Sequence, residues 1–181
     1  MAKENVVLIG FMGSGKTVIG RQAARLLDFK FVDTDEQIQQ VTGMTLSMLF
    51  KKHGEIRFRS EEELMAKKLA ARRGLVIASG GSLMPEKEPL ALLKEHGWFV
   101  LLQAAPDVIL ERISRKNNRG KRPLISGKPS LEQIRELLLR REQQYLELAD
   151  YTLNTTEIGV EEAAVRIVAQ YRKEQTPPVT S

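Results

Sequence analysis

The sequence has no cysteine among its 181 residues, so neither a disulfide nor a cysteine-ligated zinc site holds the fold together. It also lacks any run of about 18 apolar residues, the length that a membrane-spanning helix needs. Residues 1–7 do not show the basic and then apolar layout of a signal peptide. We therefore expect a cytoplasmic protein with no membrane partner. A chain of this length is expected to form one domain that buries about 70% of the unfolded surface.

Acidic residues are absent from the segment 112–128, which holds seven Lys and Arg residues. The whole chain has 28 basic and 23 acidic residues, so the chain outside this segment has 21 basic against 23 acidic residues. The positive charge is therefore local, and it predicts a loop that binds an anion. The segment also lacks the aromatic residues that nucleic-acid sites place beside their basic side chains. We therefore expect no nucleic-acid partner.

Short apolar runs alternate with longer amphipathic stretches, the pattern of a parallel sheet with helices on both faces. Five strands are predicted, at Val6–Ile9, Phe31–Val32, Leu75–Ala78, Trp98–Leu102 and Tyr151–Asn154. Helices are predicted at residues 16–27, 36–41, 57–72, 87–95, from Pro106 onward, 130–149 and 160–171. Residues 174–181 include two prolines and no apolar pattern, so we expect a disordered tail there.

A phosphate-binding motif lies between the first predicted strand and the first predicted helix. Residues 10–17, with the sequence GFMGSGKT, fit the pattern G-x-x-x-x-G-K-[ST]. Its glycines let backbone N–H groups turn inward around phosphate oxygens, and the following helix N-terminus adds partial positive charge. Lys16 would reach the β- and γ-phosphates, and the Thr17 hydroxyl would bind Mg²⁺. The motif predicts a site for a nucleoside triphosphate.

Two carboxylates and two glycines follow the second and third predicted strands. Asp33 and Asp35 follow the second strand, and Gly80 and Gly81 follow the third. Open parallel sheets bind their ligands at the carboxyl ends of the strands. One carboxylate can hold magnesium through water while the other hydrogen-bonds an acceptor hydroxyl or accepts its proton. The alternative role for both carboxylates is capping of the next helix.

A phosphate-binding loop alone does not separate switch GTPases, motor ATPases and small-molecule kinases. The chain has no N/T-K-x-D guanine-binding motif, and it is short for a large ATPase. A small kinase remains, with the basic loop as a closing lid. Arg59, Arg140 and Arg141 are candidates for holding an anionic acceptor, because a planar guanidinium suits a carboxylate or a phosphate.

Taken together, these motifs resemble the shikimate kinase family, which uses ATP to phosphorylate the 3-hydroxyl of shikimate in the pathway to chorismate and aromatic amino acids. The resemblance runs from Val6 to about Thr155. It rests on the phosphate-binding loop, Asp33-Thr34-Asp35, Gly54-Glu55 with Phe58-Arg59 and Glu62, Gly80-Gly81, Arg122-Pro123-Leu124, and Arg141 with Tyr145 and Ala149-Asp150. It implies a P-loop NTPase fold of the nucleoside-monophosphate-kinase type, with one kinase domain at 1–173, an acceptor-binding subdomain at about 35–62 and a mobile lid at about 113–128.

The resemblance also implies roles for individual residues. ATP would be bound by Gly13, Ser14, Gly15, Lys16, Thr17, Val18, Arg112 and Arg122. Magnesium would be bound by Thr17 and, through water, by Asp33. Shikimate would be bound by Asp35, Gly80, Gly81 and the carboxylate clamp of Arg59 and Arg141. The catalytic residues would be Lys16, Asp35 and Arg122.

One residue departs from the family pattern, because Ser82 stands where the family usually has a third glycine after the third strand. The nearest alternatives are other small P-loop kinases, such as a gluconate kinase or a nucleoside-monophosphate kinase, and the second would need a base-binding pocket that the sequence does not show. A nucleotide-binding regulator without kinase activity is a further alternative, and Asp35 argues against it. We expect the protein to be a monomer.

Overall fold

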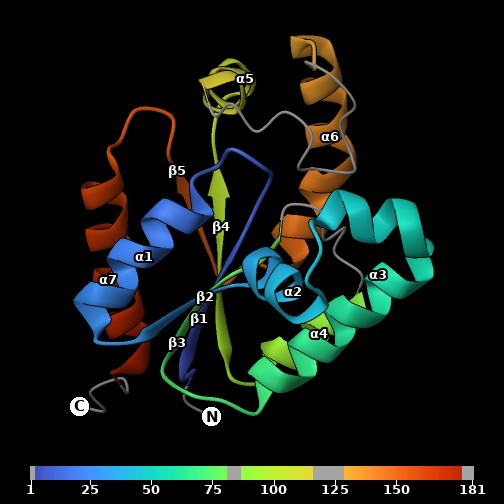
Figure 1. Cartoon of the computed structure of the whole chain (residues 1–181). Helices are drawn as coiled ribbons and strands as arrows, with labels where there is room; N and C mark the ends of the chain where they lie inside the picture. The colour runs from blue at the N-terminus through green and yellow to red at the C-terminus, as the bar shows by residue number, and fades with distance from the viewer. Residues whose placement is uncertain (1–2, 81–86, 116–128, 177–181) are drawn as a thin grey trace.

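The computed structural model describes residues 3–80, 87–115 and 129–176. Their strands form one five-stranded parallel sheet in the order β2-β3-β1-β4-β5 (Figure 1). The strands are β1 (Asn5–Ile9), β2 (Lys30–Asp33), β3 (Leu75–Ala78), β4 (Gly97–Gln103) and β5 (Tyr151–Asn154). The expected fold class is confirmed, and each of the five predicted strands is present with its ends shifted by no more than one residue.

Helices cover both faces of this sheet. They are α1 (Lys16–Leu27), α2 (Thr34–Thr42), α3 (Leu46–Ala70), α4 (Lys87–Lys94), α5 (Pro106–Arg115), α6 (Leu131–Leu148) and α7 (Val160–Gln175). Helices α1 and α7 lie on one face, while α2, α3 and α4 lie on the other (Figure 1). No helix among the described residues is long and apolar enough to cross a membrane.

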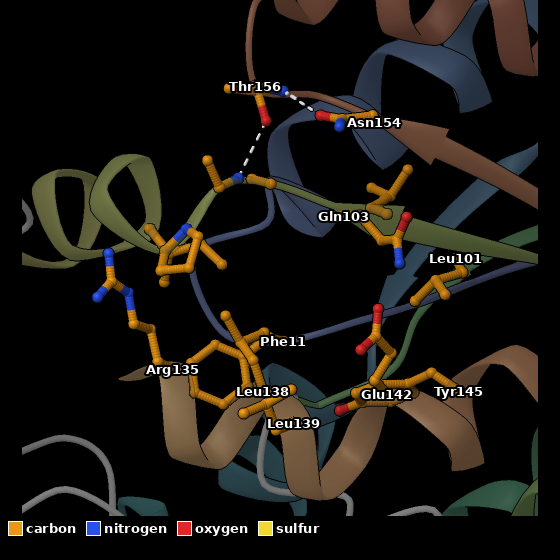
Figure 2. Close-up of a pocket in the computed structure, with 15 residues that line it drawn as sticks. Phe11, Leu101, Gln103, Arg135, Leu138, Leu139, Glu142, Tyr145, Asn154 and Thr156 are labelled. Atoms are coloured by element: carbon orange, nitrogen blue, oxygen red, sulfur yellow. Dashed lines mark hydrogen bonds between the residues drawn. The ribbon is translucent and has the colours of Figure 1, made fainter. Parts of the chain in front are cut away.

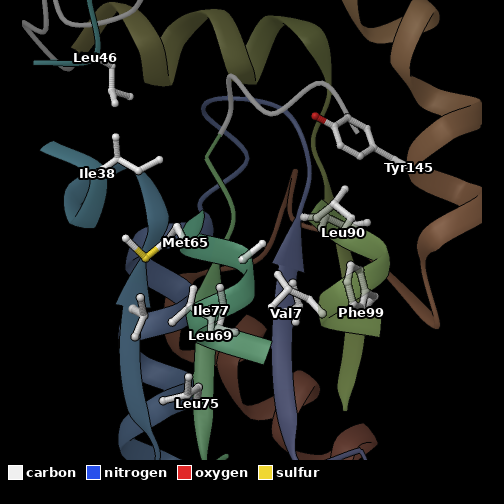
Figure 3. Close-up of a cluster of buried hydrophobic side chains, with 14 of the residues drawn as sticks. Val7, Ile38, Leu46, Met65, Leu69, Leu75, Ile77, Leu90, Phe99 and Tyr145 are labelled. Atoms are coloured by element: carbon white, nitrogen blue, oxygen red, sulfur yellow. The ribbon is translucent and has the colours of Figure 1, made fainter. Parts of the chain in front are cut away.

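The central strand β1 is buried on both faces, as a strand in the middle of a parallel sheet must be. Val6 and Leu8 join the apolar cluster beneath α1 and α7, whereas Val7 and Ile9 join the cluster beneath α3 and α4 (Figure 3). Both neighbours of β1 are parallel to it, so the carboxyl ends of all five strands lie along one edge. The phosphate-binding loop and the residues that follow β2, β3, β4 and β5 therefore meet at that edge.

Helix α3 is longer than the sequence predicted, because residues 46–53 are also helical. Thr45 caps this added part through a hydrogen bond from the Met48 N–H to its hydroxyl (3.2 Å), and Leu46 and Leu49 are buried beneath it. The two parts meet at a kink at Gly54, where φ is 78° and ψ is 178°. This backbone conformation is essentially restricted to glycine. The sequence predicted a helix only at residues 57–72, so the first part of α3 was missed.

The chain also stays ordered further toward its C-terminus than expected. The predicted tail began at residue 174, yet Glu174 and Gln175 form the end of α7, and this part of the prediction is wrong. Gln170 donates to Glu174 (3.0 Å) and Gln175 donates to the Lys3 carbonyl (2.7 Å), so these polar side chains anchor the last turn without an apolar pattern. Residues 177–181 of the expected tail lie outside the described residues.

Candidate active site

The phosphate-binding loop connects β1 to α1 and depends on three glycines in the left-handed backbone region. Gly10, Gly13 and Gly15 have φ values of 135°, 82° and 100°. At Gly10 a side chain is also excluded by space, because a Cβ atom there would lie 2.4 Å from the Leu102 carbonyl oxygen. The glycines therefore allow a tight loop that wraps around the N-terminus of α1, the arrangement that binds phosphate in other proteins.

Lys16 is buried at the start of α1, with its ammonium group held against the loop. Nζ donates to the carbonyls of Gly10 (2.6 Å) and Phe11 (2.9 Å). A buried cation needs polar partners, and carbonyl oxygens are weaker partners than phosphate oxygens. The loop thus holds a positive charge ready for an anion. Val18, also expected to contact ATP, lies two residues further along α1 and is 43% exposed.

Thr17 and Asp33 are brought together from separate elements. The Thr17 hydroxyl donates to Asp33 Oδ2 at 2.8 Å. The other oxygen, Oδ1, caps α2 by accepting the N–H groups of Asp35 (3.1 Å) and Glu36 (3.3 Å). Asp33 therefore has the capping role and still presents one oxygen to Thr17.

This pair fits a magnesium site in its chemistry. Mg²⁺ prefers hard oxygen ligands and is usually bound by one or two protein groups together with substrate phosphates and water. Thr17 and Asp33 supply a hydroxyl and a carboxylate oxygen beside the phosphate-binding loop. No group of three or more His, Asp or Glu residues in the described part of the chain is placed to bind a metal by itself.

Asp35 and Gly80 lie against each other at the ends of β2 and β3. A Cβ atom built on Gly80 would be 1.9 Å from Asp35 Oδ1, so the carboxylate occupies space that any larger residue would need. Between them, the Thr34 hydroxyl accepts the Gly80 N–H (2.8 Å) and faces the Ala78 carbonyl (3.4 Å). The structure therefore brings together two residues that the sequence assigned to the acceptor.

Arg59 reaches the same region from the second part of α3. Its guanidinium donates to the buried Glu62 carboxylate at 2.9 Å and to Glu55 at 3.3 Å. Glu62 also lines a small cavity of about 10 Å³ together with Thr34 and Ser79, which places this ion pair beside the ends of β2 and β3. The buried carboxylate fixes the position of Arg59, as a rigid clamp requires.

Arg140 and Arg141 are adjacent on α6 but lie in different environments. The Arg140 side chain is 70% exposed and forms an ion pair with Glu136 on the same helix. Arg141 is 4% exposed and its guanidinium lies 5.7 Å from the ring centre of Phe11 in the phosphate-binding loop. Burial raises the pKa of Tyr145, and the neighbouring positive charge of Arg141 partly opposes that shift. Arg141 is thus the arginine that faces the site.

Arg112 on α5 lies behind the phosphate-binding loop. It donates to the Gly13 carbonyl (3.4 Å), the Thr155 hydroxyl (3.2 Å) and the Thr155 carbonyl (2.7 Å). Thr155 follows β5, is only 1% exposed and was not among the site residues predicted from the sequence. The sequence offered only a weak indication of this role, namely a polar residue directly after a predicted parallel strand.

Two expected site residues, Gly81 and Arg122, lie outside the described residues, as do Ser82 and residues 116–128 of the expected lid. Residues 113–115, which were also assigned to the lid, form the end of α5.

A cavity of about 480 Å³ opens beside this site, between the end of β4 and α6 (Figure 2). Its walls are mainly apolar, with Phe11, Leu101 and Leu138 among them, and Arg135 and Glu142 are the charged residues in its lining. Lys16, Thr17, Asp33, Asp35 and Arg59 do not line it. The cavity therefore shares Phe11 with the phosphate-binding loop, but the polar site residues of the loop and of the Asp35 region do not line it.

Comparison with known proteins gives a consistent result. The sequence model of the shikimate kinase family matches residues 12–172. A shikimate kinase from Pelotomaculum thermopropionicum is 42% identical over 165 residues, which are 91% of this chain and 94% of that protein. Shikimate kinase from Acinetobacter baumannii, solved in complex with shikimate, has a TM-score of 0.87 and 32% identity, with 96% of each chain covered.

A gluconokinase from Sinorhizobium meliloti also superposes, with a TM-score of 0.56, 17% identity and coverage of 96% of this chain and 94% of that chain. At that identity the likeness concerns the fold alone. The family match covers most of the chain and includes residues 12–17 of the phosphate-binding loop, the Asp35 region and both candidate clamp arginines. The chain therefore belongs to the shikimate kinase family.

Proposed function

We propose that this protein transfers the γ-phosphoryl group of ATP to the 3-hydroxyl of shikimate, with Mg²⁺ as the metal. The observation that carries the proposal is the convergence of a phosphate-binding loop, one carboxylate and two arginines at the carboxyl edge of the sheet. Shikimate is a carboxylate that bears hydroxyl groups, so it needs both a cationic clamp and a hydroxyl acceptor. Arg59 and Arg141 supply the first, and Asp35 supplies the second.

On the nucleotide side, the triphosphate would lie in the loop formed by Gly13, Ser14 and Gly15. Lys16 would exchange its two carbonyl partners for phosphate oxygens, which are stronger hydrogen-bond acceptors. Thr17 and Asp33 would hold Mg²⁺, which neutralises phosphate charge when bound. We place Val18 and Arg112 at the nucleotide as well, with Arg112 beside the adenine and Arg122 over the phosphates.

On the acceptor side, the two arginines would bind the shikimate carboxylate and so fix which hydroxyl approaches the phosphate. Gly80 and Gly81 would allow the ring to come close to the backbone. Asp35 would orient the 3-hydroxyl and accept its proton as the oxygen–phosphorus bond forms and the bond to ADP breaks. Phosphoryl transfer depends mainly on positioning and charge neutralisation, and a rigid clamp supplies the positioning.

The direct test is an ADP-release assay in which shikimate, gluconate and nucleoside monophosphates are offered separately with MgATP. We expect turnover with shikimate alone. Turnover with gluconate or a nucleotide and none with shikimate would overturn the proposal in favour of another small-molecule kinase.

The role of Asp35 can be tested in the same assay. Asp35→Asn keeps the size of the side chain but removes its negative charge, and we expect kcat to fall by about 10²- to 10⁴-fold, the usual contribution of a general base. The melting temperature and the affinity for MgADP should stay close to those of the unchanged protein. A variant with normal kcat would show that Asp35 has no catalytic role.

A further inference from the structure

The hydroxyl of Thr155 lies behind the phosphate-binding loop, although the two are 141 residues apart in the sequence. Its Oγ1 is 3.2 Å from the Ser14 carbonyl oxygen and 3.0 Å from the Gln103 carbonyl oxygen. It also accepts a hydrogen bond from Arg112 Nη1 at 3.2 Å. Thr155 is 1% exposed, so water does not replace these partners.

Thr155 and Arg112 together hold two consecutive carbonyls of the loop. Arg112 donates to the Gly13 carbonyl (3.4 Å), and the Thr155 hydroxyl has its single proton available for the Ser14 carbonyl. The Gln103 carbonyl already accepts a hydrogen bond from the backbone N–H of Thr155 at 2.7 Å. The proton of the Thr155 hydroxyl therefore satisfies the Ser14 carbonyl more than it satisfies the Gln103 carbonyl. A second Arg112 bond, from Nη2 to the Thr155 carbonyl (2.7 Å), fixes the guanidinium itself.

These bonds matter because of the geometry of the peptide group. A trans peptide is planar and places its C=O and N–H on opposite sides. When the Ser14 carbonyl is held toward Thr155, the Gly15 N–H of the same peptide group points away from Thr155. Under the proposed function, this is the side on which the loop would bind phosphate. Gly13 and Gly15 are conformationally permissive, so the peptide groups between them gain direction from such partners.

We propose that Thr155 is a positioning residue for nucleotide binding, whose hydroxyl orients the phosphate-binding loop by holding the Ser14 carbonyl outward. The proposal rests on the proposed function in that ATP is the nucleotide to be bound. The Thr155 hydroxyl links the segment after β5 to the loop after β1, and these two segments meet at the carboxyl edge of the sheet. Preorganisation of this kind increases affinity by reducing the ordering that binding requires.

The test compares three variants in the full chain. Thr155→Val has nearly the same shape but lacks the hydroxyl, and Thr155→Ser keeps the hydroxyl but lacks the methyl group. Thr156→Val is the matched control, because the Thr156 hydroxyl accepts the Ala105 N–H at 3.0 Å and its side chain lines the 480 Å³ cavity instead of the loop. Each variant is measured for MgADP dissociation constant, for KM of ATP and of shikimate, and for melting temperature without ligand.

We expect Thr155→Val to weaken MgADP binding and raise the KM of ATP by about 10-fold, the effect of one lost hydrogen bond in a partly charged network. The KM of shikimate for Thr155→Val should stay within about twofold of that of the unchanged protein. The MgADP dissociation constants of Thr155→Ser and Thr156→Val should also stay within about twofold of the unchanged value. The rescue by serine separates the hydroxyl from simple filling of space. If Thr155→Val does not fold, Thr155→Ala serves in its place with the same expected result.

Unchanged MgADP affinity in Thr155→Val would overturn the proposal. Equal weakening in Thr155→Val and Thr155→Ser would also overturn it, because the methyl group and not the hydroxyl would then be responsible. MgADP binding needs no acceptor, so the outcome does not depend on shikimate. A protein that binds MgADP but does not phosphorylate shikimate would refute the proposed function and leave this test intact.

Discussion

Substitution of Gly80 by alanine should reduce turnover sharply while leaving the protein folded. The added Cβ atom would lie 1.9 Å from Asp35 Oδ1 and 2.7 Å from its Cγ, whereas an ordinary contact is 3.4 Å or more. The carboxylate must therefore move by at least about 1.5 Å. The backbone of Gly80 does not have a positive φ, so alanine adds no conformational strain there.

A displacement of about 1 Å at a reacting group can lower the rate by about 10²-fold. We therefore expect kcat to fall by about 100-fold, which corresponds to about 2.7 kcal/mol of lost transition-state stabilisation. The KM of ATP should change little, because the loop and Lys16 are not touched. Overpacking should lower the free energy of unfolding by about 1–3 kcal/mol.

The assay is ADP release at saturating ATP and shikimate, accompanied by the melting temperature of each variant. Gly159→Ala is a suitable control, since a Cβ atom there has no neighbour within 4 Å and the residue has an ordinary φ of −75°. Normal kcat in Gly80→Ala would refute the reasoning, because it would mean that the position of Asp35 does not limit the reaction. A fall in the affinity for MgADP of similar size would place the effect at the nucleotide instead.

Three further predictions concern α6 and α7. Arg141→Ala should raise the KM of shikimate by about 10- to 100-fold, because a charge-assisted hydrogen bond is lost. Arg140 is exposed, so Arg140→Ala should change the KM by less than about twofold, and equal effects of the two substitutions would contradict the clamp. Ser130→Ala removes the capping box at the start of α6 and should lower the free energy of unfolding, measured by urea titration, by about 1 kcal/mol. An unchanged free energy of unfolding would show that the capping box does not stabilise the protein. Burial and the negative charge of Glu4 raise the pKa of Tyr171 above 10.0, so the folded state holds that proton more strongly than the unfolded state, and the melting temperature should fall as the pH rises above 10. Tyr171→Phe should reduce this fall, and a pH profile that the substitution leaves unaltered would show that Tyr171 does not contribute to it.

Local features of this protein could be predicted from the sequence because their causes are local. The glycine-rich motif at residues 10–17 can be identified from consecutive residues alone, and the strand and helix predicted around it are present. The helix predicted at residues 130–149 is present, and the Ser130–Gln133 capping box that starts it joins residues only three apart. The order of strands along the chain, with apolar runs buried on both faces, was sufficient to predict a parallel sheet.

The site could be predicted only where a motif marked it. The sequence named Arg140 and Arg141 as equal candidates from the residues alone, and it was the packing of α6 against the loop that buried Arg141 and left Arg140 exposed. The first part of α3 was not predicted from the sequence, and a kink at Gly54 separates it from the predicted second part.

Tertiary structure decided which residues act as neighbours. The contact between Gly80 and Asp35 and the bonds from Thr155 to the loop join segments that are between 45 and 141 residues apart. Periodicity and capping operate over a few residues and carry no information about such pairs. The sequence alone therefore determined the five strands, most of the helices and the phosphate-binding motif. The folding of parallel strands to one common edge determined which side chains share the site.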